Sequence, residues 1–234
     1  MEFRCKEFEL NHSHSTMKVG TDAILLSALL PDIEPQNILE IGTGCGIVAL
    51  CMAQRYQQAV ITAIDIDRES IDEAAASFAN SKFRQRLTAI QTSLQNFAKT
   101  PLQNFDLIVS NPPFFENSLL SDKINRNISR HNINLTLEDL ALCSSTLLSS
   151  NGTLALILPN KETTKFLLIS AQHNLFCTTQ YLIADKQSKP CKRIVSLFKT
   201  TKPTSHIAQT HIILRKEDNT MTKAYKDLTS AYLL

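Results

Sequence analysis

Tryptophan is absent from this chain of 234 residues, glycine is scarce, and no apolar stretch is long enough to cross a membrane. The longest apolar stretch, residues 23–30, contains Ser27 and falls well short of the roughly 18 residues that a membrane-spanning helix needs. The opening residues include Glu2, whereas a signal peptide has a basic region followed by an apolar one. We therefore expect no membrane segment and a cytoplasmic location.

Cysteines with the spacing of a metal or redox site are also missing. The six cysteines form no C-x-x-C pair and do not cluster with histidine. His12 and His14 lie close together, but no third ligand is apparent near them. The cysteines are interpreted as reduced thiols. We also expect that the protein binds no metal and that it is a monomer.

Glycine makes up about 2% of the chain, against the roughly 7% that is usual. Three of the five glycines, Gly42, Gly44 and Gly46, fall within five residues. Glycine adopts backbone conformations that other residues avoid and lets a ligand approach the backbone closely. Their concentration therefore predicts a turn at which a side chain cannot fit.

Acidic residues are missing from one long basic segment. Residues 186–216 contain eight Lys or Arg and no Asp or Glu, although the net charge of the whole chain is only +2. Residues 1–115, in contrast, carry 13 acidic and 9 basic side chains. Since Lys and Arg bind a phosphate backbone without regard to sequence, the basic segment predicts contact with nucleic acid.

The rest of the composition, 43% hydrophobic and 20% charged, is that of a globular protein whose length suits one large α/β domain. Apolar periodicity predicts strands over 38–41, 60–66, 87–91, 105–110 and 153–158, and helices over 47–56, 68–80, 135–148 and 161–174. This alternation predicts a mostly parallel sheet with helices on both faces. Residues 193–200 and 207–214 are expected to form a terminal pair of strands, with one antiparallel strand at or near the edge.

The first thirty residues are expected to form a lead-in segment that packs over the active site, with residues 31–234 as the main domain. Phe3, Phe8 and Leu10 have the spacing of packing residues, and Asp22 is expected to cap a helix that ends before Pro31. Gly152 is expected to turn the chain into the fifth strand.

The first motif is E-x-G-x-G-x-G, which begins at Glu40 between a predicted strand and a predicted helix. Doubly wound sheets bind nucleotides at such a turn, where the helix offers free N–H groups to an anion. Ile47 stands where the dinucleotide fingerprint G-x-G-x-x-G requires glycine. A turn that serves only packing is the alternative.

The second motif is Asp65, which closes the next predicted strand about 20 residues later. An acid at this position can accept hydrogen bonds from both hydroxyls of a ribose. Asp67 precedes Arg68 and is predicted to cap the following helix. A capping role is the alternative for Asp65 as well.

The third motif is Asn111-Pro112-Pro113-Phe114, directly after the strand 105–110. The prolines hold the chain extended and leave nearby carbonyls without local N–H partners. The Asn111 amide oxygen and the Pro112 carbonyl can then accept hydrogen bonds from one –NH₂ group, with Phe114 as a flat apolar face. A proline turn without function is the alternative, but three motifs on successive strand ends favour a site for a planar amine.

Together these motifs resemble the class I S-adenosylmethionine-dependent methyltransferases that act on exocyclic amino groups. Within this class, the chain most resembles the bacterial tRNA1(Val) adenine-N6 methyltransferase family, and the resemblance extends over nearly the whole chain. It is carried by three segments: K-V-G-T-D at 18–22, N-P-P-F-F at 111–115 and Arg130-His131. The resemblance implies a Rossmann-like α/β fold with a mostly parallel seven-stranded sheet, one antiparallel strand and helices on both faces.

The resemblance also implies a reaction: transfer of a methyl group from S-adenosyl-L-methionine to the N6 amino group of adenine 37 in the anticodon loop of tRNA. The catalytic residues would be Asn111, Pro112 and Phe114. The cofactor would be bound by Glu40, Gly42, Gly44, Gly46, Asp65, Ser93 and Asn111; Ser93 stands where many relatives have an acid for the cofactor adenine. The tRNA would be bound by Arg126, Arg130, His131, Lys189, Lys192 and Arg193.

Other functions stay open at this point. A methyltransferase for protein glutamine uses N-P-P followed by an aromatic residue, usually Tyr, while a DNA adenine methyltransferase would need a separate recognition domain. A nicotinamide-dependent oxidoreductase predicts G-x-G-x-x-G and leaves the N-P-P-F segment without a role. A non-catalytic RNA-binding module would not need the amine site.

Overall fold

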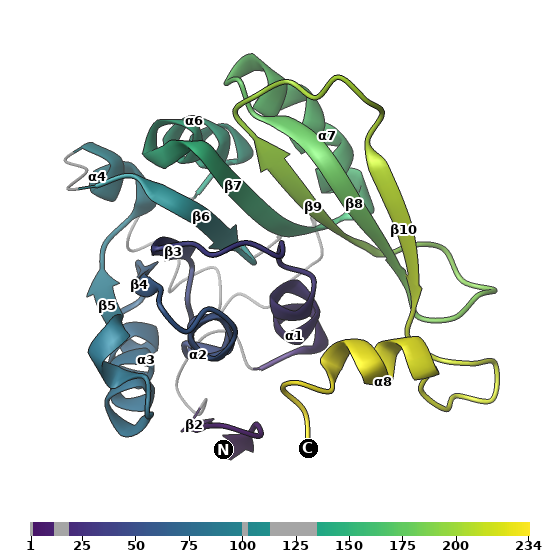
Figure 1. Cartoon of the computed structure of the whole chain (residues 1–234), viewed down its shortest axis with the longest axis horizontal. Helices are drawn as coiled ribbons and strands as arrows, with labels where there is room; N and C mark the ends of the chain where they lie inside the picture. The colour runs from purple at the N-terminus through teal and green to yellow at the C-terminus, as the bar shows by residue number, and fades with distance from the viewer. Residues whose placement is uncertain (1, 12–18, 100–102, 113–134) are drawn as a thin grey trace, which may run out of the picture.

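The structure, a computed structural model, describes residues 2–11, 19–99, 103–112 and 135–234. An eight-stranded sheet forms its centre, in the order β10-β8-β9-β7-β6-β3-β4-β5 (Figure 1). Its strands are β3 (Asn37–Ile41), β4 (Val60–Asp65), β5 (Leu87–Gln91), β6 (Phe105–Ser110), β7 (Leu148–Pro159), β8 (Phe176–Ala184), β9 (Arg193–Lys199) and β10 (Ala208–Ile213). A separate antiparallel hairpin joins β1 (Glu2–Arg4) to β2 (Glu9–Asn11).

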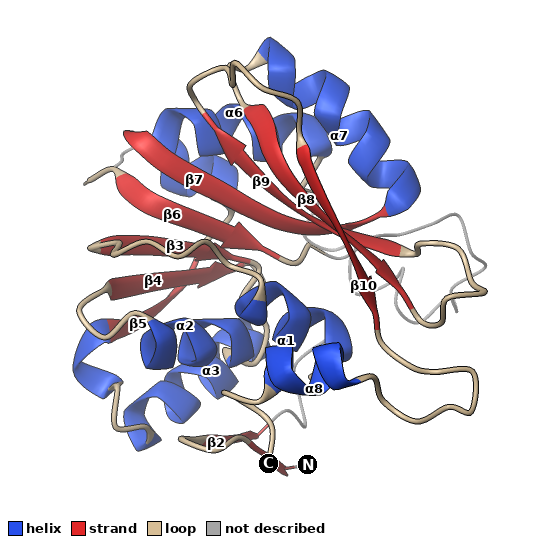
Figure 2. Ribbon diagram, turned by 45° about the vertical axis from the view of Figure 1, so that its right-hand side comes forward, coloured by secondary structure: helices blue, strands red, loops and turns tan. Residues whose placement is uncertain are grey.

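Helices cover both faces of the sheet (Figure 2). One face carries α1 (Thr21–Ala28), α2 (Ile47–Arg55), α3 (Arg68–Asn80) and α8 (Lys223–Thr229), and the other carries α4 (Leu94–Lys99), α6 (Leu137–Leu147) and α7 (Asn160–Gln172). A short 3₁₀ turn, η1 (Arg84–Arg86), precedes β5. Each face has its own buried apolar cluster, which confirms the predicted layers.

The sheet has a single antiparallel strand among the described residues. Strands β3 to β7 run parallel, β9 runs against both of its neighbours β7 and β8, and β10 runs parallel to β8. The predicted count of seven strands is wrong: the predicted ranges include β10 but not β8, which is inserted between β9 and β10 and brings the count to eight. The predicted pairing of the last two strands is also wrong: β9 lies between β7 and β8, so both of its edges are already hydrogen-bonded.

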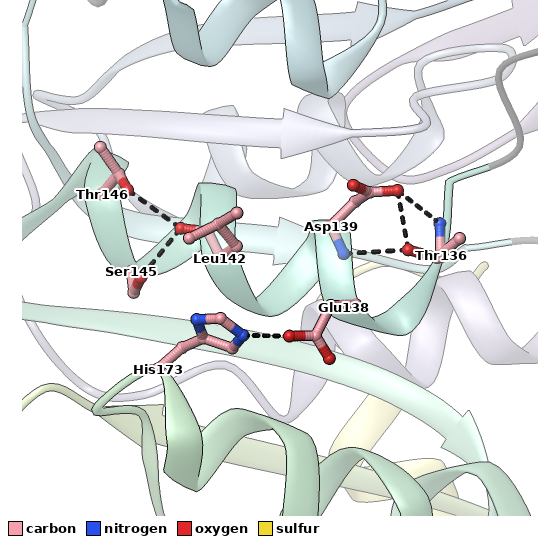
Figure 3. Close-up of polar contacts among 7 residues, drawn as sticks. All are labelled: Thr136, Glu138, Asp139, Leu142, Ser145, Thr146 and His173. Atoms are coloured by element: carbon pink, nitrogen blue, oxygen red, sulfur yellow. Dashed lines mark hydrogen bonds and ion pairs between the residues drawn. The ribbon is translucent and has the colours of Figure 1, made fainter.

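The ends of two elements differ from the sequence prediction. Strand β7 starts earlier than predicted, at Leu148, but its pairing with β6 is irregular between Leu148 and Thr153, and Gly152 ends this irregular stretch. A Cβ there would lie 2.9 Å from the Phe105 carbonyl oxygen and 3.0 Å from the Ser149 carbonyl oxygen, so a side chain would not fit. Helix α6 begins after Thr136, whose hydroxyl accepts a hydrogen bond from the Asp139 N–H (3.0 Å) while the Asp139 carboxylate accepts one from the Thr136 N–H (3.3 Å). Figure 3 shows this capping box, and below it the contact between Glu138 and His173 that ties α6 to the end of α7.

The described part of the first thirty residues, 2–11 and 19–30, shares the core of the main sheet. Phe8 and Leu10 are buried, and Phe3 packs against the same apolar cluster as α1 and α2. The C-terminal segment closes over them, since the Lys6 N–H donates to the Tyr232 carbonyl (3.0 Å) and the Tyr232 hydroxyl donates to the Ser27 carbonyl (3.3 Å). Through Tyr232, these contacts connect the hairpin to α1.

All six cysteines are free thiols. Within the described ranges, no helix is long and apolar enough to cross a membrane. The same ranges contain no group of three His, Cys, Asp or Glu side chains that could hold a metal ion.

Candidate active site

The three sequence motifs meet at one edge of the sheet. Strands β6, β3 and β4 are neighbours and parallel, so their carboxyl ends lie side by side. The Ser110 hydroxyl at the end of β6 donates to the carbonyl of Ile41 at the end of β3 (2.8 Å), and both residues are buried. The segment that begins at Asn111 is thereby fixed beside the glycine turn.

The glycine turn requires left-handed backbone at three positions. The φ angles are +74° at Gly42, +53° at Gly44 and +85° at Gly46. The N–H groups of Gly42 and Thr43 both donate to the Ile64 carbonyl, at 2.9 and 3.1 Å, which holds the turn against β4. Residues other than glycine rarely adopt such angles, so the scarce glycines are placed where the backbone needs them.

The first and last of these glycines have different surroundings. A Cβ at Gly46 would lie 2.6 Å from Cε1 of Phe78 and 3.3 Å from the Cβ of Ala74, so this glycine lets α2 start against α3. A Cβ at Gly42 would meet no atom within 4 Å. Gly42 therefore borders open space that a ligand can fill, whereas Gly46 is required for packing.

Glu40 is buried beneath the turn, with only 3% of its surface exposed. Its carboxylate accepts a hydrogen bond from the Thr43 hydroxyl (2.7 Å). Burial, and to a smaller extent the nearby charge of Asp65, raises the pKa of Glu40 to about 8. A group with this pKa is mostly protonated near neutral pH, and a cation placed beside it favours its charged form.

Asp65 supports the turn from the end of β4. One carboxylate oxygen accepts from the Gly44 N–H (2.9 Å) and the other from the Asp67 N–H (3.0 Å). Burial raises the pKa of Asp65 above its usual value. Each oxygen keeps a second lone pair, so the group can still accept from hydroxyls of a ligand.

The two predicted helix caps have different outcomes. Asp67 is the N-cap of α3, as predicted, and its carboxylate accepts from the Ser70 N–H at 2.9 Å. The prediction for Asp22 is wrong, because Gly20 is the N-cap of α1 and Asp22 lies in the first turn. The Asp22 carboxylate accepts instead from Nε of Arg193 (3.0 Å).

A cavity of about 290 Å³ opens at this edge. Its walls come from three places: the start of α1 (residues 20–23), the glycine turn with Glu40 and the start of α2, and Asn111 after β6. None of residues 20–23 was among the predicted site residues, although the lead-in segment that contains them was expected to pack over the active site. Residues 20–22 also belong to the K-V-G-T-D segment that carries part of the family resemblance. The cavity is thus lined by the Glu40 carboxyl group, by backbone of the glycine turn and by the Asn111 amide.

Asp65 and Ser93 do not line this cavity. Ser93 is buried, and its hydroxyl accepts from the Asn96 N–H (3.2 Å) at the start of α4, a helix that the sequence did not predict. The Thr92 N–H donates to the Asp65 carbonyl (2.9 Å), which places Ser93 just beyond Asp65 along the same edge. Among the described residues, the Ser93 hydroxyl donates to no acceptor, so it keeps a hydrogen for a ligand.

The described part of the amine motif consists of Asn111, half-buried, and Pro112, buried. Phe114 lies outside the described residues. So do three of the expected RNA contacts, Arg126, Arg130 and His131.

The basic segment is divided between opposite edges of the sheet. Arg193 pairs with Pro159 at the carboxyl end of β7, while Lys199 pairs with Thr153, where the pairing of β7 with β9 begins. Exposed Lys189 and Lys192 precede β9 and belong to the edge with the cavity, whereas Lys199 and Lys202 belong to the far edge, about 20 Å away at 3.3 Å per residue.

The methyltransferase small-domain model matches residues 10–182, about three quarters of the chain. The chain belongs to the methyltransferase small-domain family. Three relatives are each named tRNA1(Val) (adenine(37)-N6)-methyltransferase. The relative from Flavobacterium psychrophilum is 32% identical, and the alignment covers 99% of both chains. The relative from Parabacteroides distasonis is 34% identical, with 99% of this chain and 97% of the relative covered. The relative from Bacteroides fragilis is 38% identical, with 84% of this chain and 83% of the relative covered.

Solved structures of other methyltransferases share the fold of this family member. A predicted O-methyltransferase from Agrobacterium tumefaciens superposes with a TM-score of 0.69 at 19% identity, covering 90% of this chain and 96% of its own. A ribosomal protein L11 methylase from Lactobacillus delbrueckii superposes with a TM-score of 0.56 at 18% identity, covering 81% and 83%. The expected Rossmann-like α/β fold is confirmed.

The different surroundings of the two glycines predict different outcomes for alanine. Gly46→Ala should lower the free energy of unfolding by roughly 2–4 kcal/mol, since it adds a clash with Phe78 to the strain at positive φ. Gly42→Ala should cost only about 1–2 kcal/mol of stability, from strain alone, but should impair ligand binding in the cavity. Urea unfolding of both variants measures the difference, and equal destabilisation of the two would contradict it.

Proposed function

We propose that this protein transfers a methyl group from S-adenosyl-L-methionine to N6 of adenine 37 in tRNA1(Val). The observation that carries the proposal is that Asn111, from the amine motif, lines the same cavity as the glycine turn and Glu40. Similarity over nearly the full length to relatives with this named activity supports the choice of substrate.

The cavity fits the methionine part of the cofactor. Glu40 is the acid that a cationic amino group needs, and the space beside Gly42 admits a ligand against bare backbone. Asp65 retains acceptor capacity for the ribose hydroxyls, and Ser93, farther along the edge, would bind the cofactor adenine. When bound, the cofactor supplies a methyl group already activated by the positive sulfonium.

The protein's own residues then orient the target amine toward the methyl group. Asn111 and the Pro112 carbonyl would hold the target amine in line with the methyl group by accepting its two hydrogens, which draws the nitrogen lone pair out of conjugation with the ring. Phe114 would stack on the adenine. Oriented contact of this kind accounts for a large share of the rate in reactions that need no covalent intermediate.

Two loops at the cavity edge would bind the tRNA backbone. The loop after β8 carries Lys186, Lys189 and Lys192, and the Lys186 ammonium donates to the Glu217 carbonyl in the loop after β10 (3.1 Å). Glu217 in turn accepts from the Ser188 hydroxyl (3.0 Å), so the two loops form one surface, to which exposed Arg215 and Lys216 also belong. Arg126, Arg130 and His131 would extend it from the segment after the amine motif.

Several further features belong to the proposal. We assign residues 1–30 to a lead-in segment that closes over the site and residues 31–234 to the methyltransferase domain. We also propose that the protein acts as a monomer in the cytoplasm and needs no metal.

Incubation with unmodified tRNA1(Val) and methyl-labelled cofactor should yield N6-methyladenosine, detected by mass spectrometry of the nucleosides. A tRNA with guanine in place of adenine 37 is the matched control and should stay unlabelled. Asn111→Ala should reduce turnover at least about 100-fold, the scale for removing an oriented polar group, with a small effect on cofactor affinity. Label on a protein glutamine or on DNA, and none on tRNA, would refute the substrate assignment.

Cofactor binding should release a proton near pH 7. Free Glu40, with its pKa of about 8, is mostly protonated there, and a cationic ligand lowers that pKa and expels up to about one proton. Calorimetric titrations in two buffers of different ionisation enthalpy measure the number. Glu40→Gln should abolish the release; an unchanged proton count in this variant would show that Glu40 does not face the ligand.

The division of the basic segment predicts which lysines matter for RNA. Changing Lys189 and Lys192 together to Gln should flatten the salt dependence of tRNA binding by up to about 0.7 in log–log slope for each single-strand phosphate that the variant no longer neutralises. Changing Lys199 and Lys202 to Gln removes the same charge from the far edge and should leave the slope near that of the wild type. An equal change in salt slope in the two double variants would contradict the proposed RNA-binding surface at the cavity edge.

A further inference from the structure

Arg193 and Asp22 join two segments that lie 171 residues apart in the chain. Arg193 begins β9 beside the end of β7, and its Nε donates to an Asp22 carboxylate oxygen at 3.0 Å. Its Nη1 donates to the Lys192 carbonyl at 3.2 Å. The two side chains are 40% and 37% exposed, so the pair is partly shielded from water.

Asp22 belongs to the wall of the cavity. It lies in the first turn of α1, and residues 20–23 all line the space opposite the glycine turn. The body of α1 is held by burial of residues 23–27, but its N-cap, Gly20, has no side-chain capping bond. The bond from Arg193 thus ties the first turn to the start of β9 from outside the helix.

Resting on the proposed function, we infer that Arg193 is a positioning residue for the cofactor wall and does not bind the RNA backbone. Its guanidinium neutralises Asp22, which would otherwise leave an unpaired acid on a cavity that already contains Glu40. It also holds the first turn of α1 at a fixed place across from the glycine turn. Two of the five guanidinium N–H groups of Arg193 are already taken by Asp22 and the Lys192 carbonyl, and its charge is paired, whereas Lys189 and Lys192 form no ion pair within the described part of the structure.

Binding of S-adenosylhomocysteine to the whole protein, measured by calorimetry, tests this inference without using tRNA. Arg193→Gln and Asp22→Asn should each raise the dissociation constant about fivefold, the upper range for a partly exposed ion pair. The double variant should also show about a fivefold rise, because either single change already breaks the pair. Arg193→Lys, which keeps the charge, should recover most of the affinity.

Two further readouts separate positioning from general destabilisation and from RNA binding. In steady-state methylation, Arg193→Gln should raise KM for the cofactor with little change in kcat, and the salt slope of its tRNA binding should match that of the wild type. A flattened salt slope with unchanged cofactor affinity would make Arg193 a phosphate ligand and overturn the inference. Additive effects in the double variant would overturn it as well. Absence of cofactor binding by the wild-type protein would instead refute the proposed function itself.

Discussion

The left-handed turn between β3 and α2 is the constraint on which the site depends. Its three positive φ angles let the backbone fold back so that two N–H groups reach the Ile64 carbonyl and a third reaches Asp65. Gly46 then allows α2 to start in contact with Phe78 of α3. The turn therefore joins the helical layer to the sheet, and the cavity is the space left beside it.

Two acids give this site its chemical character: buried Glu40 in the cavity wall and half-buried Asp65 next to it. Glu40 and Asp65 approach the turn from adjacent strands, each held by at least one hydrogen bond from the turn itself. Their pKa values are raised because burial penalises the charged forms. A ligand that brings positive charge removes part of this penalty, which favours a cationic cofactor over a neutral one.

The direction of β9 divides the basic side chains between the two ends of the strands. Because β9 runs against its neighbours, one end of the basic segment reaches the cavity edge and the other lies at the far edge. The reversal separates lysines that are close in sequence, and it brings Arg193 to Asp22 in the wall of the cavity. One strand thus links the proposed RNA surface to the cavity.

Local sequence alone determined the parts whose physical cause is local. The strands β5 and β6 and the helix α3 have the predicted bounds, and Asp67 caps α3, because apolar periodicity and capping act within a few residues. The three clustered glycines likewise predicted the turn that they form. Tertiary structure decided the rest: the insertion of β9 between β7 and β8, the eighth strand, the burial that shifts the pKa of Glu40, and the pairing of Asp22 with Arg193. Each of these depends on contacts between segments far apart in the chain, and the residues at one end of such a contact carry no local sign of the partner at the other.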